Sequence, residues 1–191
     1  MKRFVLVICL CGLLALPAMA VAGVFAPSNE FQGRVEGDPN TYFGFDLGKS
    51  NGKQRVKHVT GVLPMSCYNG DQGMLPVRVH GPFKVNGIAG LLVGLSGETA
   101  ARTKALATAA RERTHRHRPR IFAGDGDVDT PIGQGEAFLF GFLNRHGKAF
   151  GYIQVYLQTD TFGRCYSGGL NWKVKRGATV APPPSMGGLG R

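Results

Sequence analysis

The sequence predicts a mainly β protein, an antiparallel β-sandwich or small barrel of seven or eight strands with a basic, partly helical insertion. Residues 75–80 and 170–175 alternate apolar with polar or proline positions, which is the period of a half-buried strand. Gly, Asn and Asp separate these short segments, as they separate the strands of hairpins. Three aromatic-Gly-aromatic tripeptides recur along the chain, at 43–45, 140–142 and 150–152.

The segment 137–158 predicts a hairpin. Phe138, Phe140 and Phe142 share one side of its first arm, and leucines occupy the other side. A strand that is apolar on both sides belongs in the middle of a sandwich or barrel. The turn falls at 144–147, and 150–157 runs back.

Further strands are expected near 30–36, 41–47, 54–63 and 83–95. In each aromatic-Gly-aromatic tripeptide the glycine leaves space that a ring from a neighbouring strand can cover. We therefore interpret these tripeptides as sheet packing. A carbohydrate-binding platform is the alternative, and it would require the rings to face solvent.

Residues 97–134 break the β pattern and are interpreted as an insertion between two strands. Residues 98–110 are rich in Ala and Thr and predict a short helix, and Pro119 ends any helix there. Residues 124–129 alternate Gly or Val with Asp and are expected to be mobile. The domains are therefore a β domain at 30–176 containing this insertion, and a disordered tail at 177–191 rich in Pro and Gly.

Residues 1–22 have the pattern of a secretory signal peptide, with a short basic start, an apolar run and small residues at Ala18, Ala20 and Ala22. An uncleaved anchor and a lipoprotein are less favoured alternatives. No later run approaches the ~20 apolar residues of a membrane span. We therefore expect a secreted protein, extracellular or periplasmic, with no transmembrane span after cleavage. The formal charge of +11 falls to +9 with loss of Lys2 and Arg3.

Cleavage would also remove two of the 4 cysteines, leaving Cys67 and Cys165. A lone pair in an oxidising compartment is expected to form a disulfide, here closing a loop of about 98 residues. Two free buried thiols are the alternative. A disulfide would remove both thiols from any catalytic role.

Charge is concentrated in residues 101–120, which carry a net +6. Such a block attracts anionic polymers or surfaces, and arginine can place two parallel hydrogen bonds on phosphate or sulfate. The candidate anion-binding residues are Arg111, Arg113, Arg116, Arg118 and Arg120. No aromatic residues interleave them and no specific nucleic-acid motif is present. A solvated loop without a ligand is the alternative.

Carboxylates in 125–136 have the spacing of an EF-hand calcium loop. The candidate Ca²⁺ ligands are Asp125, Asp127, Asp129 and Glu136. Thr130 stands where the loop needs Gly, and helical flanks are missing. The alternative is a polar loop whose acids pair with the nearby arginines.

Three stretches carry a resemblance: Phe31-Gln32-Gly33, the run 62–67 that ends in Cys67, and the run 165–176 with its Cys-x-x-Gly-x-x-x-Trp pattern. In these the chain resembles small secreted bacterial β-rich domains of the actinobacterial type. The resemblance implies secretion, β architecture and a cysteine pair. It implies no reaction, because no reaction is assigned to that type of domain.

Standard catalytic signatures, such as Gly-x-Ser-x-Gly and His-Glu-x-x-His, are absent from the sequence. We therefore expect an exported, non-enzymatic binding or envelope-associated domain of unknown ligand, which contacts anionic polymers through 101–120. The alternative is a secreted enzyme acting on cell-wall or carbohydrate polymers. A deep polar cleft would favour the enzyme, and a flat surface would favour the binding domain.

Overall fold

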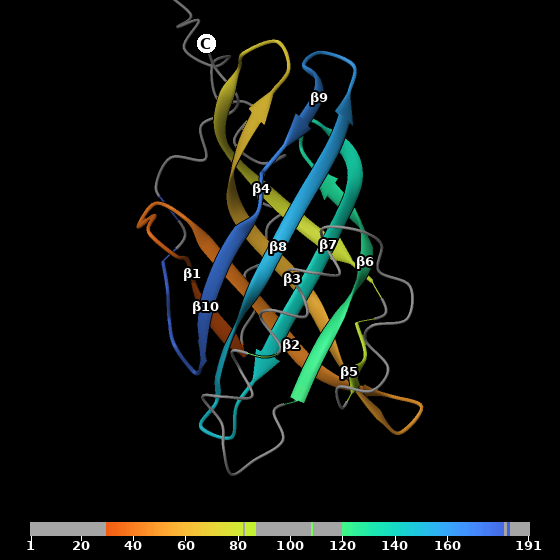
Figure 1. The fold of residues 1–191 in the computed structure, drawn as a ribbon, viewed down its shortest axis with the longest axis vertical. Helices are drawn as coiled ribbons and strands as arrows, with labels where there is room; N and C mark the ends of the chain where they lie inside the picture. Colours follow the sequence, from red (N-terminus) through yellow and green to blue (C-terminus); the bar gives the residue numbers. More distant parts are fainter. Residues whose placement is uncertain (1–29, 82, 87–107, 109–119, 182, 184–191) are drawn as a thin grey trace, which may run out of the picture.

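The structure is a computed structural model that describes residues 30–81, 83–86, 108, 120–181 and 183. Its strands form one antiparallel sheet in the order β10-β1-β2-β3-β4-β6-β7-β8-β9 with β5 beside β6, which confirms the mainly β prediction (Figure 1). The strands are β1 (Phe31–Val35), β2 (Tyr42–Ser50), β3 (Lys53–Cys67), β4 (Gln72–His80), β5 (Val85–Asn86), β6 (Arg120–Thr130), β7 (Gly133–Leu143), β8 (Lys148–Thr159), β9 (Gly163–Tyr166) and β10 (Leu170–Arg176).

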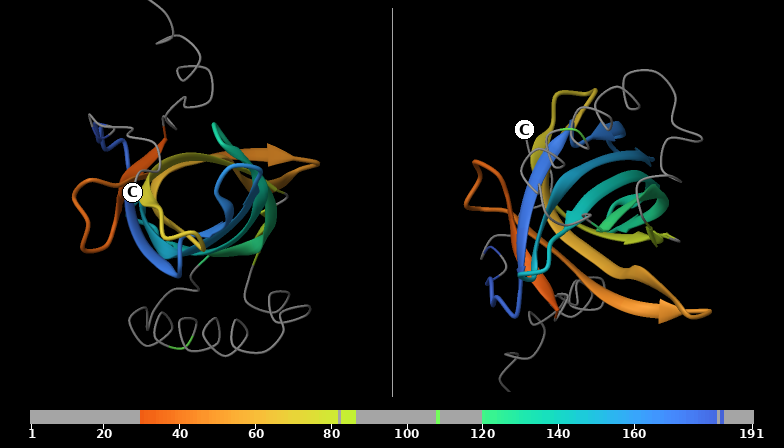
Figure 2. Two further views of the ribbon diagram at one scale, coloured as in Figure 1. Left: turned by 90° about the horizontal axis from the view of Figure 1, so that it is seen from above. Right: turned by 60° about the horizontal axis from the view of Figure 1, so that its bottom comes forward.

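The sheet closes on itself. β10 pairs with β1 on one side and with β8 on the other, so β1, β2, β3, β4, β6, β7, β8 and β10 form a ring (Figure 2). Of the two architectures expected from the sequence, the strand pairing gives the barrel. Within the described strands, closure gives both β1 and β10 a partner on each side, so neither is a free sheet edge of the kind that promotes aggregation.

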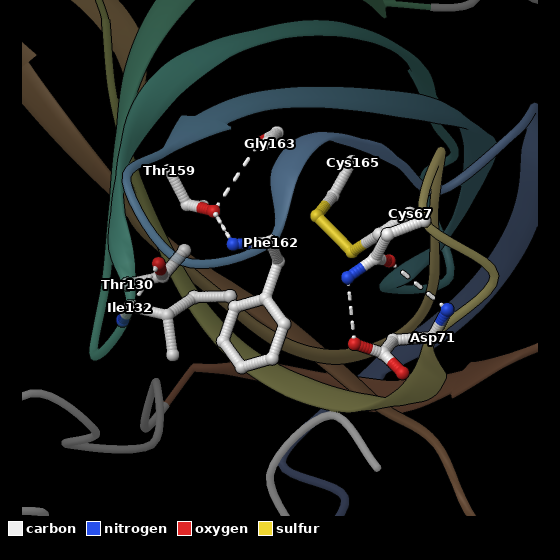
Figure 3. The surroundings of a disulfide bond; sticks show 9 residues. Cys67, Asp71, Thr130, Ile132, Thr159, Phe162, Gly163 and Cys165 are labelled. Carbon is white, nitrogen blue, oxygen red and sulfur yellow. Dashed lines mark hydrogen bonds between the residues drawn. A yellow bond between two sulfur atoms is a disulfide. The ribbon is translucent and has the colours of Figure 1, made fainter. Parts of the chain in front are cut away.

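A second closure narrows one end of the barrel. β9 continues beside β8, and its Cys165 lies directly opposite Cys67 of β3. At this end β9 pairs directly with β3, so β10, β1 and β2 do not lie between β8 and β3 here as they do in the rest of the ring. The predicted disulfide between Cys67 and Cys165 is confirmed and lies at this junction (Figure 3). The Cys67 amide donates a hydrogen bond to the Asp71 carbonyl at 2.8 Å, which turns the chain back after β3.

Aromatic rings fill the interior. Trp172 is fully buried and stacks on Phe43 with ring centroids 4.7 Å apart. Its ring lies over Gly141 and Gly151, which are opposite each other on β7 and β8. A Cβ at Gly151 would lie 2.5 Å from Trp172 Cζ2. A ring from a neighbouring strand therefore covers the glycine in two of the three aromatic-Gly-aromatic tripeptides, as expected.

The predicted insertion at 97–134 is wrong in its second half, because 120–130 is β6 and pairs with β7 along its whole length. Gly124 and Gly126 face the interior, where the ring of Phe83 lies against both, and a Cβ at Gly126 would come within 2.9 Å of that ring. Asp125, Asp127 and Asp129 alternate with the inward positions and point outward. The Gly-Asp alternation that indicated a mobile loop is therefore the two-sided pattern of a strand.

Other sequence expectations meet the described residues only in part. The strand expected at 83–95 is observed as β5, and its remainder lies outside the described residues. The expected helix at 98–110 also lies outside them except for Thr108, and so does the signal peptide at 1–22. The tail was expected to be disordered from 177, yet the Val180 amide donates to Gln32 Oε1 at 2.9 Å. No helix within the described ranges is long and apolar enough to span a membrane.

The disulfide is expected to stabilise the barrel strongly. Replacing both Cys67 and Cys165 by Ser should lower the free energy of unfolding by about 4 kcal/mol, because a cross-link over a long loop restricts the unfolded chain. Urea unfolding of oxidised protein measures this difference. A reducing agent should shift the wild-type midpoint toward that of the variant and leave the variant unchanged. Equal midpoints for the oxidised wild type and the variant would contradict the expectation.

Gly151→Ala should destabilise the barrel by about 2 kcal/mol or more, because overpacking a closed core forces rings and backbone apart. The new methyl group would meet the Phe140 carbonyl oxygen at 2.0 Å and Trp172 at 2.5 Å. Gly48→Ala is the matched control, since its methyl group meets only the flexible Lys57 side chain at 2.9 Å. Thermal unfolding of both variants distinguishes the two positions, and similar melting temperatures would rule out the proposed role of Gly151.

Candidate functional site

The middle of the barrel is filled by side chains, so the described interior has no room for a ligand and the outer wall is the surface to examine. Phe31, Phe43, Phe45, Phe122 and Trp172 are all fully buried there. Phe45 meets Phe122 and Trp172 edge-on, with ring centroids 5.4 and 5.9 Å apart. Small eight-stranded barrels have interiors just wide enough for their own side chains, and the contacts in this core fit that rule.

Three tyrosines are the only large apolar side chains that are strongly exposed among the described residues. Tyr68 is 79% exposed, Tyr156 53% and Tyr166 42%. All three line the same open hollow of about 680 Å³ on the outer wall, beside the disulfide. Solvent-facing aromatic rings gathered in one place mark interaction surfaces, whereas scattered ones need no explanation. We call this surface the tyrosine hollow.

The strand register brings the three rings together. Tyr156 on β8 lies directly opposite Tyr166 on β9. Tyr68 follows the end of β3, and its ring centroid is 6.1 Å from that of Tyr166. The Tyr68 amide donates to the Arg164 carbonyl at 2.9 Å. Because Tyr68 and Tyr166 each follow a disulfide-bonded cysteine, the disulfide also holds these two rings near each other.

Polar side chains surround the rings. Gln154 joins two tyrosines, because its Oε1 accepts from the Tyr152 hydroxyl at 2.9 Å and its Nε2 donates to the Tyr156 hydroxyl oxygen. The remaining polar side chains that line the hollow are Glu136, Gln158 and Arg164. The hollow therefore combines ring faces with both hydrogen-bond donors and acceptors. Such a surface suits a ligand that has apolar faces and a polar rim.

The predicted calcium loop is not present, because its residues form the β6–β7 hairpin. Asp125, Asp127 and Asp129 alternate on the outer side of β6, and carboxylates two residues apart on a strand are separated by ~6–7 Å. Glu136 lies opposite Asp127, and Asp129 pairs with His80 at 2.9 Å. The described part of the chain has no group of three or more acidic, His or Cys residues that could hold a metal ion. Of the four acids, Glu136 alone lines the tyrosine hollow.

The predicted anion-binding arginines are mostly outside the described residues. Arg111, Arg113, Arg116 and Arg118 lie there, so their role stays a prediction. Arg120 begins β6, and its Nη1 donates to Gln54 Oε1 at 2.7 Å.

Sequence reasoning missed the tyrosine hollow, although part of its signal was available. Tyr156 stands on the polar side of its strand, between Gln154 and Gln158. That position indicates an outward ring. Tyr68 and Tyr166 each follow a predicted disulfide cysteine, so the pairing alone would have placed them near each other.

The fold and this surface together define an antiparallel β-barrel with a polar-aromatic hollow on its outer wall. Comparison of the chain with protein-family models, with curated proteins and with solved structures finds no match. The resemblance to small secreted bacterial β-rich domains stays a prediction.

Brief treatment with tetranitromethane should nitrate Tyr68, Tyr156 and Tyr166, because their rings reach solvent. Tyr42 and Tyr152 should stay unmodified because they are buried. Since the chain has 5 tyrosines in all, peptide mass spectrometry can assign each one. Early nitration of Tyr42, or protection of all three hollow tyrosines, would contradict the described surface.

Proposed function

We propose that this protein is an exported, non-enzymatic binding domain that holds a carbohydrate in the tyrosine hollow. The observation that carries the proposal is the convergence of three exposed tyrosines on one hollow. A sugar ring offers C–H faces that pack on aromatic rings and hydroxyl groups that exchange hydrogen bonds with amides, carboxylates and guanidinium groups. Gln154, Glu136 and Arg164 supply those three polar groups around the tyrosines.

Export is the second part of the proposal. The sequence pattern of residues 1–22 supports it, and the disulfide between Cys67 and Cys165 is consistent with an oxidising compartment. An exported domain meets the polymers of cell envelopes and of the surrounding medium. Carbohydrate polymers are abundant among these.

The composition of the hollow favours binding over cleavage. Most glycosidases use two carboxyl groups that flank the bond to be broken. Within the described lining of the hollow, Glu136 is the one carboxylate. Asp127 faces it from β6 but does not line the hollow. Assays for released reducing ends, with Glu136→Gln as control, test the alternative of a secreted enzyme.

Contact with anionic polymers through 101–120 remains a further part of the proposal. Its support is the charge density of that stretch, which is a property of the sequence.

Tyr156→Ala should weaken binding of the best oligosaccharide in a cell-wall panel by roughly tenfold, since loss of one central aromatic contact costs ~1–2 kcal/mol. Tyr156→Phe is the matched control, because it keeps the ring and removes only the hydroxyl group. Calorimetry measures the affinities, and thermal unfolding should show little change for either variant, since the side chain is exposed. Failure of every oligosaccharide to bind, or equal binding by the Ala variant, would refute the proposed ligand.

A further inference from the structure

A second hollow opens on the outer wall toward the other end of β8. It measures about 500 Å³, and its polar side chains come from Gln32, Asn144, Lys148, Lys173 and Lys175. The three lysines point away from the interior, because the residues that alternate with them, Ala149, Trp172 and Val174, are buried inside the barrel. We call this surface the lysine hollow.

The register places like charges against each other. Lys175 of β10 lies directly opposite Lys148 of β8, and Lys173 is two residues away on the same side of β10. Like charges that face each other across neighbouring strands destabilise a sheet. Among the residues that the structure describes, Lys173 pairs with Glu36, whereas Lys148 and Lys175 have no ion pair. No Asp or Glu belongs to the described lining of the lysine hollow.

Asn144 adds a neutral donor at the edge of this surface. Its Oδ1 accepts the amides of His146 and Lys148, each at 2.9 Å. These two bonds fix the orientation of the carboxamide and leave its NH₂ group as the part that can meet a ligand. An ammonium group and an amide NH₂ only donate hydrogen bonds, so the lysine hollow is complementary to an acceptor that carries negative charge.

We propose that the lysine hollow binds the charged groups of an acidic polysaccharide. On a strand, residues two apart are separated by ~6–7 Å, and directly opposite residues by ~5 Å. The three lysine side chains therefore leave the wall of the barrel at separate points rather than from one place. Successive sulfate or carboxylate groups along a polymer can each contact a different lysine of this surface. The proposal shares only the class of ligand with the proposed function, because no side chain lines both hollows.

The test uses the full chain with Lys148→Gln and Lys175→Gln combined. The matched control is Lys53→Gln with Lys57→Gln, which removes the same charge from exposed positions on β3. The probes are a sulfated heparin hexasaccharide and a carboxylated oligogalacturonate, each measured by calorimetry at low salt. The hollow variant should bind at least one probe about tenfold more weakly than wild type, with less than twofold change in the control. The probe that responds identifies the charged group.

Stability provides a second readout. Removing both members of the like-charged pair should leave the melting temperature of the hollow variant unchanged or raise it, because their mutual repulsion is lost. Lys175→Arg keeps the charge and should keep the binding. A hollow variant that loses binding only together with a fall in melting temperature would overturn the proposal, because the lysines would then act through the fold.

Three other outcomes would also overturn it. Equal losses in the hollow variant and the control would show an effect of net charge alone. Binding of duplex DNA with the same dependence on Lys148 and Lys175 would show a general polyanion surface. Unchanged binding of both probes by the hollow variant would refute the site. If Tyr156→Ala still weakened binding of a neutral oligosaccharide, that result would leave the proposed function intact.

Discussion

The contact of Trp172 with Gly141 and Gly151 is the constraint on which the barrel depends. Trp172 lies on β10, directly opposite Gly151 of β8, and its ring extends over β8 to Gly141 of β7. The two missing side chains leave the space that the ring fills, so β10 can approach β8 only in this register. β10 also pairs with β1, and this pairing closes the ring of strands. The same register turns Lys173 and Lys175 to the outside.

The disulfide between Cys67 and Cys165 holds the strands together at the narrow end of the barrel. It joins β3 to β9 where the β1–β2 hairpin no longer separates them. Tyr68 and Tyr166 each follow one of the two cysteines. The disulfide in the wall of the barrel therefore holds their rings near each other on its surface. Successive side chains of a strand point to opposite sides of the wall. The inward side chains therefore stabilise the barrel, and the outward side chains form its surface.

The sequence predicted well what depends on local pattern. The 137–158 hairpin was predicted correctly because its first arm is apolar on both sides and its second arm alternates. The cysteine pair followed from the number of cysteines left after residues 1–22. The insertion was wrong at 120–134 because Gly124 and Gly126 are explained by Phe83, a ring some 40 residues away that no local pattern reveals. The tyrosine hollow was missed for a similar reason, since Tyr156 joins Tyr68 and Tyr166 only through the pairing of β8 with β9. Charge density drew attention to 101–120, whereas the Lys148 and Lys175 pair is visible only in the register.

The pairing of β1 with β10 also determines when the protein can fold. Phe31 lies opposite Arg176, whose guanidinium group lies 5.1 Å from the centre of the Phe31 ring, so the first and last strands of the sheet are partners. During synthesis β1 is made before β10, and all the strands between them have to be made before its second neighbour exists. Contacts between distant parts of a chain form slowly, because loop closure costs entropy before the contact gives stability. The ring of strands therefore cannot close before β10 has been made, so the contact that completes the barrel joins two strands that are far apart in the sequence.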